Sequence, residues 1–176
     1  MPVTPLHYFL AYIIHRESKF KLNFPALIVG SMVPDLEVPI IFIISRGKID
    51  RLVLHSILGS MTLGLLISIF ISLLIYPRIL GFLNCKKELK CIISKSLIIS
   101  SLIGVLSHVL LDALHHEYNP LLYPFSTNSI DIFVLFGDYI LASKIISTVF
   151  IILGSMILFR EIRLGREGFL RRILLG

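Results

Sequence analysis

Long apolar runs, each ended by a short polar or charged stretch, are the dominant pattern along this chain. Three runs, residues 52–76, 95–116 and 133–159, are long enough to cross a bilayer, which takes about 20 helical residues. The pattern therefore predicts an all-α, polytopic membrane protein with about three full transmembrane helices.

The N-terminal fifty residues hold shorter or interrupted apolar segments. Residues 5–14 follow Thr4, which is suited to cap a helix, but this segment is too short to span a membrane. Residues 24–45 are long enough, yet Pro34 and Asp35 interrupt them. Because proline disrupts the helix that precedes it, we expect two or three short or broken helices here, with a break at Pro34.

Composition agrees with a membrane protein. Apolar residues make up 56% of the 176 positions, charged residues only 16%, and the mean hydropathy is +0.90. No repeat or low-complexity linker divides the chain, so we expect one membrane-embedded domain over residues 1–176 that keeps its first apolar segment. Residues 160–176 are basic and amphipathic, which is typical of a tail on a membrane surface.

The net charge of +6 has an explanation other than nucleic acid. The basic residues lie beside apolar runs without an RNA- or DNA-binding signature, so no nucleic-acid partner is expected. If the segments cross in turn, one end holds few basic residues and the other holds most of them: Arg46, Lys48 and Arg51 against Arg16, Lys19, Lys21, Arg78, Lys86, Lys87, Lys90, Lys95 and five tail arginines. The positive-inside rule then predicts an integral cell membrane protein whose basic loops and C-terminus are cytoplasmic.

The less basic, extracytoplasmic end gathers residues that suit a metal ion. His108 and Asp112 are four apart, so one helix face stacks them about 5–6 Å apart. An aspartate inside a membrane helix is costly unless it is paired, which favours a shared divalent ion, with zinc as the first choice, over a plain hydrogen bond. The same crossing order brings further candidate ligands to this end: His7, Asp35 and His55.

Other polar residues near this cluster receive different expectations. Glu37 and His115 are candidates for a general base or for groups that support the ligands. His116 and Glu117 are expected at the solvated exit of the helix, and His15 at the opposite end. Cys85 and Cys91 match no zinc or redox spacing and are interpreted as ordinary thiols without a role in the site.

A bound metal ion would polarise a phosphoryl or carbonyl oxygen and activate water, so hydrolysis is the natural reaction class. The chain lacks the GxSxG, P-loop and GxGxxG motifs. Two alternatives stay open: a non-catalytic metal-binding protein or cation transporter, and a scaffold in which polar groups only bond helices together. Small residues that allow close helix packing would suit the transporter: Gly59, Ser60, Gly64 and Ser68. Ligands at mid-depth favour transport, and ligands at one mouth favour hydrolysis.

The order of motifs resembles a known family. His7, PDLE (34–37), HS (55–56), SHVLLD (107–112) and NPLLYPF (119–125) resemble the YdjM-like predicted membrane-bound metal-dependent hydrolases, which are distantly related to zinc-dependent phospholipase C. The resemblance covers roughly residues 4–125. It implies a helical metal site with five ligands: His7, Asp35, His55, His108 and Asp112.

The chain also departs from the motifs of these proteins. Where they show PDxDH, this chain has Glu37 and Val38, and of HRxxTHS it keeps only the second histidine, His55. These changes remove up to two nitrogen donors and favour one metal ion over two. The leading prediction is an integral membrane metallohydrolase that acts on a phosphoester, such as the head group of a membrane lipid, at the outer face.

Overall fold

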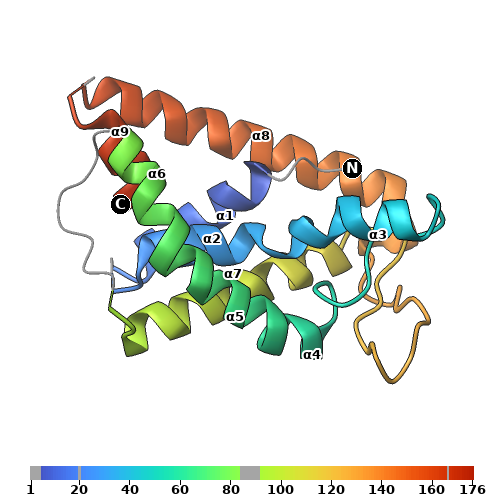
Figure 1. The fold of residues 1–176 in the computed structure, drawn as a ribbon. Coiled ribbons are helices and arrows are strands. Elements are labelled where there is room, and N and C mark those ends of the chain that lie inside the picture. The colour runs from blue at the N-terminus through green and yellow to red at the C-terminus, as the bar shows by residue number, and fades with distance from the viewer. Residues whose placement is uncertain (1–4, 20, 84–91, 166) are drawn as a thin grey trace.

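The computed structural model describes residues 5–19, 21–83, 92–165 and 167–176, and within them every regular element is helical (Figure 1). The all-α prediction is confirmed. Several residues considered above lie outside the described residues: Thr4, Cys85, Lys86, Lys87, Lys90, Cys91 and Arg166. The elements, with η marking 3-10 and π-helical turns, are α1 (Pro5–Glu17), α2 (Phe24–Met32), η1 (Pro34–Glu37), α3 (Val38–Ile44), α4 (Ile57–Gly59), η2 (Ser60–Gly64), α5 (Leu65–Phe70), η3 (Ile71–Ile75), α6 (Tyr76–Phe82), α7 (Lys95–Ala113), η4 (Leu135–Gly137), α8 (Tyr139–Arg163) and α9 (Phe169–Leu175).

Four segments of the described chain are long and apolar enough to cross a membrane: Phe24–Ile44, Ile57–Phe82, Lys95–Ala113 and Tyr139–Arg163. Three of them correspond to the three predicted transmembrane helices. The fourth is the interrupted N-terminal segment, in which α2, η1 and α3 follow one another with little change of direction (Figure 1). The polytopic helical architecture is thus as predicted, with α1 as a shorter additional helix.

The break at Pro34 occurs as expected. Helix α2 ends at Met32, and residues 34–37 form the 3-10 turn η1 before α3 resumes at Val38. Proline has no N–H to donate to the preceding turn, so the helix tightens here. The turn leaves Asp35 half-buried and Glu37 buried against the rest of the bundle.

Helices α2 and α7 pack with their backbones in direct contact. A Cβ atom added to Gly30 would lie 2.6 Å from the carbonyl oxygen of Ser101, and one added to Gly104 would lie 2.6 Å from that of Leu27. Only glycine fits at such a crossing, as in many membrane helix pairs. This close approach holds α7 against α2 one turn before His108.

The other faces of the long helices remain apolar and exposed. Leu66 and Phe70 on α5, and Ile151, Ile152 and Met156 on α8, each expose more than half of their side chains. Large apolar side chains on the outside of a bundle are what a lipid environment requires. The described bundle therefore has a lipid-compatible surface around a small polar interior.

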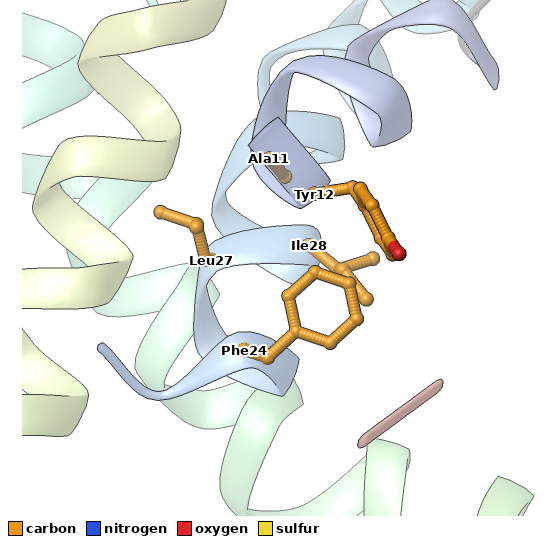
Figure 2. Packing of buried hydrophobic residues seen from close by; sticks show 5 residues of the cluster. All are labelled: Ala11, Tyr12, Phe24, Leu27 and Ile28. Carbon is orange, nitrogen blue, oxygen red and sulfur yellow. The ribbon is translucent and has the colours of Figure 1, made fainter. Parts of the chain in front are cut away.

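One end of the bundle is closed by apolar packing and by the C-terminal helix. Ala11, Tyr12, Phe24, Leu27 and Ile28 form a buried cluster between α1 and α2 (Figure 2). Helix α9 returns to this end, where the hydroxyls of Tyr8 and Tyr76 donate to the carbonyl oxygens of Ile173 and Leu174, at 2.8 and 2.7 Å. Residues 160–163 of the predicted tail belong to α8 instead. The tail is thus split between the end of α8 and a docked helix.

Candidate metal centre

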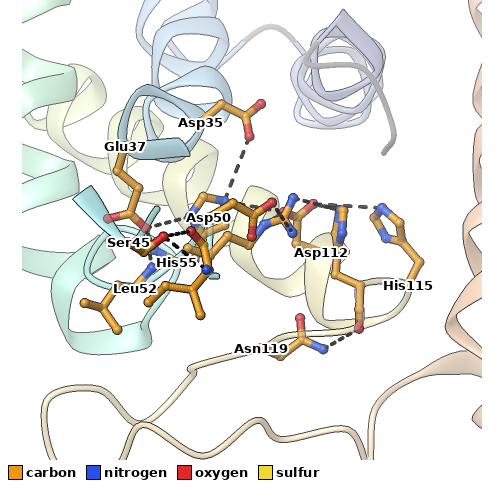
Figure 3. Close-up of polar contacts among 12 residues, drawn as sticks. Asp35, Glu37, Ser45, Asp50, Leu52, His55, Asp112, His115 and Asn119 are labelled. Atoms are coloured by element: carbon orange, nitrogen blue, oxygen red, sulfur yellow. Dashed lines mark hydrogen bonds and ion pairs between the residues drawn. The ribbon is translucent and has the colours of Figure 1, made fainter. Parts of the chain in front are cut away.

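The opposite end of the bundle gathers the predicted ligands. His108 and Asp112 lie on the last turns of α7 and are both buried, with 3.4 Å between Nε2 and Oδ2. His55 comes from the loop just before α4, next to the N-cap residue Ser56, and Asp35 from η1. One ligand atom from each of Asp35, His55, His108 and Asp112 lies within 4.8 Å of all the others. Figure 3 shows Asp35 and His55 turned toward Asp112.

The two histidines of this group are held in one orientation and one tautomer. The Nδ1 atom of His108 lies 2.7 Å from the carbonyl oxygen of Ser31, and that of His55 lies 2.8 Å from Oε1 of Glu37. Both partners are acceptors, so each Nδ1 carries the proton and donates it. The Nε2 lone pairs then point inward, which is the usual arrangement of metal-bound histidine.

These inward atoms fit a cation. Nε2 of His55, Nε2 of His108 and both carboxylate oxygens of Asp112 are buried and have no hydrogen-bond partner among the described residues. The separations of 3.4–3.5 Å between Nε2 and Oδ2 exceed the roughly 2.7–3.2 Å of an N–H···O bond. Buried acceptor atoms that receive no hydrogen bond are stabilised by a positive charge, which a metal ion or a protonated imidazole can supply. Two imidazole nitrogens and two carboxylates form a donor set that suits zinc or a similar divalent ion.

A second group of donors shares Asp112. Ligand atoms of Asp112, His115 and His116 also lie within 4.8 Å of one another, and all three residues are buried. Nε2 of His115 and of His116 lie 4.0 and 3.6 Å from Oδ1, the carboxylate oxygen that the first group leaves free. The Nδ1 atom of His115 donates to the carbonyl oxygen of Leu111 at 2.8 Å, which again leaves Nε2 as an acceptor.

His7 reaches the same carboxylate from α1. Its Nε2 atom lies 3.5 Å from Oδ1 of Asp112, and its ring stacks on that of His108 at 3.8 Å. It belongs to neither of the two close groups described above. Burial, assisted by the neighbouring His108, lowers the pKa of His7 to about 3, so the imidazole is neutral.

Glu37 is fully engaged by hydrogen bonds. Oε1 accepts from Nδ1 and the backbone N–H of His55 and from the N–H of Leu52, and Oε2 accepts from the N–H of Leu54, at 2.8–3.2 Å. A carboxylate that holds four donors anchors the loop before α4 and orients His55. Between the two roles considered for Glu37, this geometry favours support of a ligand over proton transfer.

The structure adds two residues that sequence reasoning did not place in the site. His116, expected at a solvated helix exit, is buried, whereas Glu117 beside it is exposed as expected. Arg51 is also buried: its guanidinium donates to Nε2 of His116 at 3.2 Å, and its Nε lies 3.4 Å from Oδ2 of Asp112. Burial lowers the pKa of His116 to about 2, so it accepts this bond as a neutral ring.

The chain was compared with known protein families, and the result agrees with its apolar helices. The family model of the YdjM inner membrane protein matches residues 6–170. This chain belongs to the YdjM inner membrane protein family. No curated protein and no solved structure matches it. Membership in this inner membrane protein family agrees with the four apolar helical segments that are long enough to cross a membrane.

In this YdjM-family protein the cluster borders a cavity of about 730 Å³ at the same end of the bundle. The cavity reaches the cluster at His115 and His116, and its wall carries three cationic side chains, Lys48, Arg51 and Lys144, and two acidic ones, Asp50 and Glu117. A cavity with excess positive charge attracts anions. The cavity thus approaches the buried donor atoms from one end of the bundle.

Proposed function

We propose that this YdjM-family protein is a metal-dependent hydrolase that acts on a phosphoester, such as a lipid head group, at the membrane surface. The observation that carries the proposal is the convergence of buried acceptor atoms without donors, beside a cationic cavity. The ligands of a divalent ion, with zinc as the first choice, would be Asp35, His55, His108 and Asp112.

Each part of the chain has a separate task in this reaction. A bound divalent ion supplies Lewis acidity for the attack of water on a phosphoryl group. Ser31 and Glu37 keep the Nε2 atoms of His108 and His55 aimed at the centre. Lys48 and Lys144 lie in the cavity wall, where they can bind the negative charge of a phosphoester.

The position of the cluster supports hydrolysis over transport. Most of the donors come from the start of α1, the loop before α4 and the end of α7, which meet at one end of the bundle (Figure 1), and η1 adds Asp35 from within the Phe24–Ile44 segment. The cavity lies at that same end. A site gathered at one mouth suits a reaction with a molecule in the outer leaflet, whereas a transport site needs access from both sides.

We also propose the orientation of the protein. The end far from the cluster carries most of the described basic side chains, which include Arg16, Lys19, Lys21, Arg78, Lys95, Arg160, Arg163, Arg171 and Arg172. By the positive-inside rule this end is cytoplasmic, and the cluster then faces outward. A phospholipid of the outer leaflet would reach the cavity from this side.

Elemental analysis of the purified protein together with an assay of phosphodiester hydrolysis tests the proposal. We expect the wild type to contain a bound divalent metal ion, and Asp112→Ala and His108→Ala to lose both the metal and the activity. After a chelator has removed the metal from the wild type, added zinc should restore its activity. His15→Ala is the matched control, because His15 is buried at the other end against Phe24, with 4.7 Å between ring centroids. Metal binding without hydrolysis of any phosphoester would favour the non-catalytic alternative, and variants that bind metal like wild type would contradict the site.

A further inference from the structure

We propose that the centre holds two metal ions, bridged by Asp112, with the second ion bound by Asp112, His115 and His116. This inference rests on the proposed first site only in that Asp112 is shared. It changes the predicted number of ions from one to two and gives His115 and His116 the role of ligands.

The division of nitrogen atoms between the two carboxylate oxygens carries the argument. Oδ2 of Asp112 faces Nε2 of His55 at 3.5 Å and Nε2 of His108 at 3.4 Å. Oδ1 faces Nε2 of His7 at 3.5 Å, Nε2 of His116 at 3.6 Å and Nε2 of His115 at 4.0 Å. A carboxylate with a separate set of imidazoles on each oxygen has the arrangement of a bridge between two ions, which lie about 3.5–4 Å apart in such centres.

The second set has its own unpartnered atoms. Nε2 of His115 and Oδ1 of Asp112 are buried and accept no hydrogen bond from any described residue. The His115 side chain is 1% exposed and cannot be satisfied by bulk water. Its Nδ1–H is anchored on the carbonyl oxygen of Leu111, so its Nε2 is oriented as firmly as that of His108. An ion bound by the first group would leave Nε2 of His115 and Oδ1 of Asp112 without a partner.

Arg51 is the competing cation at this position. Its guanidinium donates to Nε2 of His116, and a fixed positive charge next to Asp112 could take the place of the second ion. However, its Nε forms no hydrogen bond within the described chain, and it approaches Oδ2 rather than Oδ1. The guanidinium therefore leaves Oδ1 of Asp112 and Nε2 of His115 without a hydrogen-bond partner, and an ion bound there would take over the lone pair of His116 that now accepts from Arg51.

A second ion would narrow the substrate class of the proposed hydrolase. His115 and His116 line the cationic cavity, so the ion that they hold would lie nearer the cavity than the first. Pairs of ions suit phosphoryl transfer, because together they can neutralise both the attacking and the leaving oxygen. This favours a phosphoester over a carboxylic ester as the substrate.

The number of bound ions decides the question. Full-length protein in detergent is stripped with a chelator, reloaded with zinc, and its metal content is measured per chain. We expect two ions in the wild type, one in His115→Ala and in His116→Ala, and none in Asp112→Ala. Glu117→Ala, an exposed neighbour, and His15→Ala, a buried histidine at the far end, should keep both ions.

A spectroscopic measurement on the wild type avoids any dependence on variants that fail to fold. Two manganese ions bridged by one carboxylate are magnetically coupled, so the electron paramagnetic resonance signal should change from that of isolated ions as the second equivalent binds. Uncoupled manganese at every loading, or one ion per chain in the wild type, overturns the second site but leaves the proposed hydrolase intact. No bound metal overturns both. If Arg51→Met raises the count from one to two, the arginine is the second cation and the inference is wrong.

Discussion

Two buried carboxylates at opposite ends of the molecule, Asp112 and Glu161, differ in the hydrogen bonds that they accept. Asp112 and Glu161 are each 3% exposed. Glu161 accepts hydrogen bonds from the hydroxyl of Tyr12 at 2.7 Å and from Nε of Arg172 at 2.8 Å. Asp112 accepts none from the described residues, although five histidines lie near it. The two carboxylates are thus equally buried, but the described chain supplies hydrogen-bond donors only to Glu161.

The difference separates a structural ion pair from a binding site. At Glu161 the chain supplies the positive charge and the donors itself, which closes α9 onto α8. At Asp112 the chain supplies mainly acceptors, and a buried group without a partner costs free energy. Such an arrangement is stable when a cation from solution completes it, so the two ends should respond in opposite ways to the same type of substitution.

The largest effect is expected from Asp112→Asn. It removes the negative charge of the one carboxylate that both proposed metal sites have in common. Metal affinity should therefore fall by more than the roughly 10- to 100-fold that the loss of a supporting residue causes. Competition with a chromophoric chelator measures this loss. In metal-free protein Asp112 has the Arg51 guanidinium nearby but accepts no hydrogen bond, and Arg51 keeps Asp50 as an ion-pair partner at 3.5 Å, so thermal stability should change little. A metal-free variant that is clearly less stable than metal-free wild type would break the comparison.

A smaller effect on the same end is expected from Glu37→Gln. The amide can no longer act as an acceptor toward all four donors, so the loop before α4 and the ring of His55 lose their fixed orientation. Metal affinity should fall about 10- to 100-fold, as for other residues that support a ligand. The chelator titration applies again, with the exposed Glu117→Gln as control. Unchanged affinity with lower activity would instead give Glu37 a role in proton transfer.

At the other end, Tyr12→Phe tests the structural half of the comparison. It deletes one hydrogen bond to a charged, buried acceptor, and the free energy of unfolding should fall by about 1.5–3 kcal/mol. Unfolding by denaturant in detergent measures the change. Metal content should stay at the wild-type value, and any loss of metal would show that the two ends are coupled.

The smallest effect is expected from Lys144→Gln in the cavity wall. Lys144 forms none of the hydrogen bonds of the centre, so metal content should not change. The loss of one exposed charge should raise KM for an anionic phosphoester about fivefold or less, with kcat unchanged, and the effect should shrink at high salt. A fall in kcat would show that this lysine contacts the reacting group.

The positions of the long helices, and the pairing of His108 with Asp112 on one face of α7, could be predicted from the sequence. Apolar runs located the long helices, the proline located the break, and the order of crossing predicted that His7, Asp35 and His55 meet His108 and Asp112. These predictions rest on local periodicity and on the alternation of crossing direction. The first depends on neighbouring residues, and the second depends only on the order of the segments along the chain.

Arg51 and His116 were misjudged because their burial depends on distant parts of the chain. His116 follows the end of α7, where a helix usually meets solvent, and only the return of the loop before α4 covers it. Arg51 looked like one more loop charge in the count of basic residues. The docking of α9 on Tyr8 and Tyr76 is likewise a contact between residues more than ninety positions apart.

The contact between Gly30 and Gly104 links the spacing of α2 and α7 to the orientation of His108. Gly30 precedes Ser31, whose carbonyl holds the ring of His108, and Gly104 lies one turn before that ring. A single methyl group at either position would wedge the two helices apart and lengthen this hydrogen bond without touching a ligand. The proposed metal site should therefore depend on the spacing of α2 and α7, although neither glycine is a ligand.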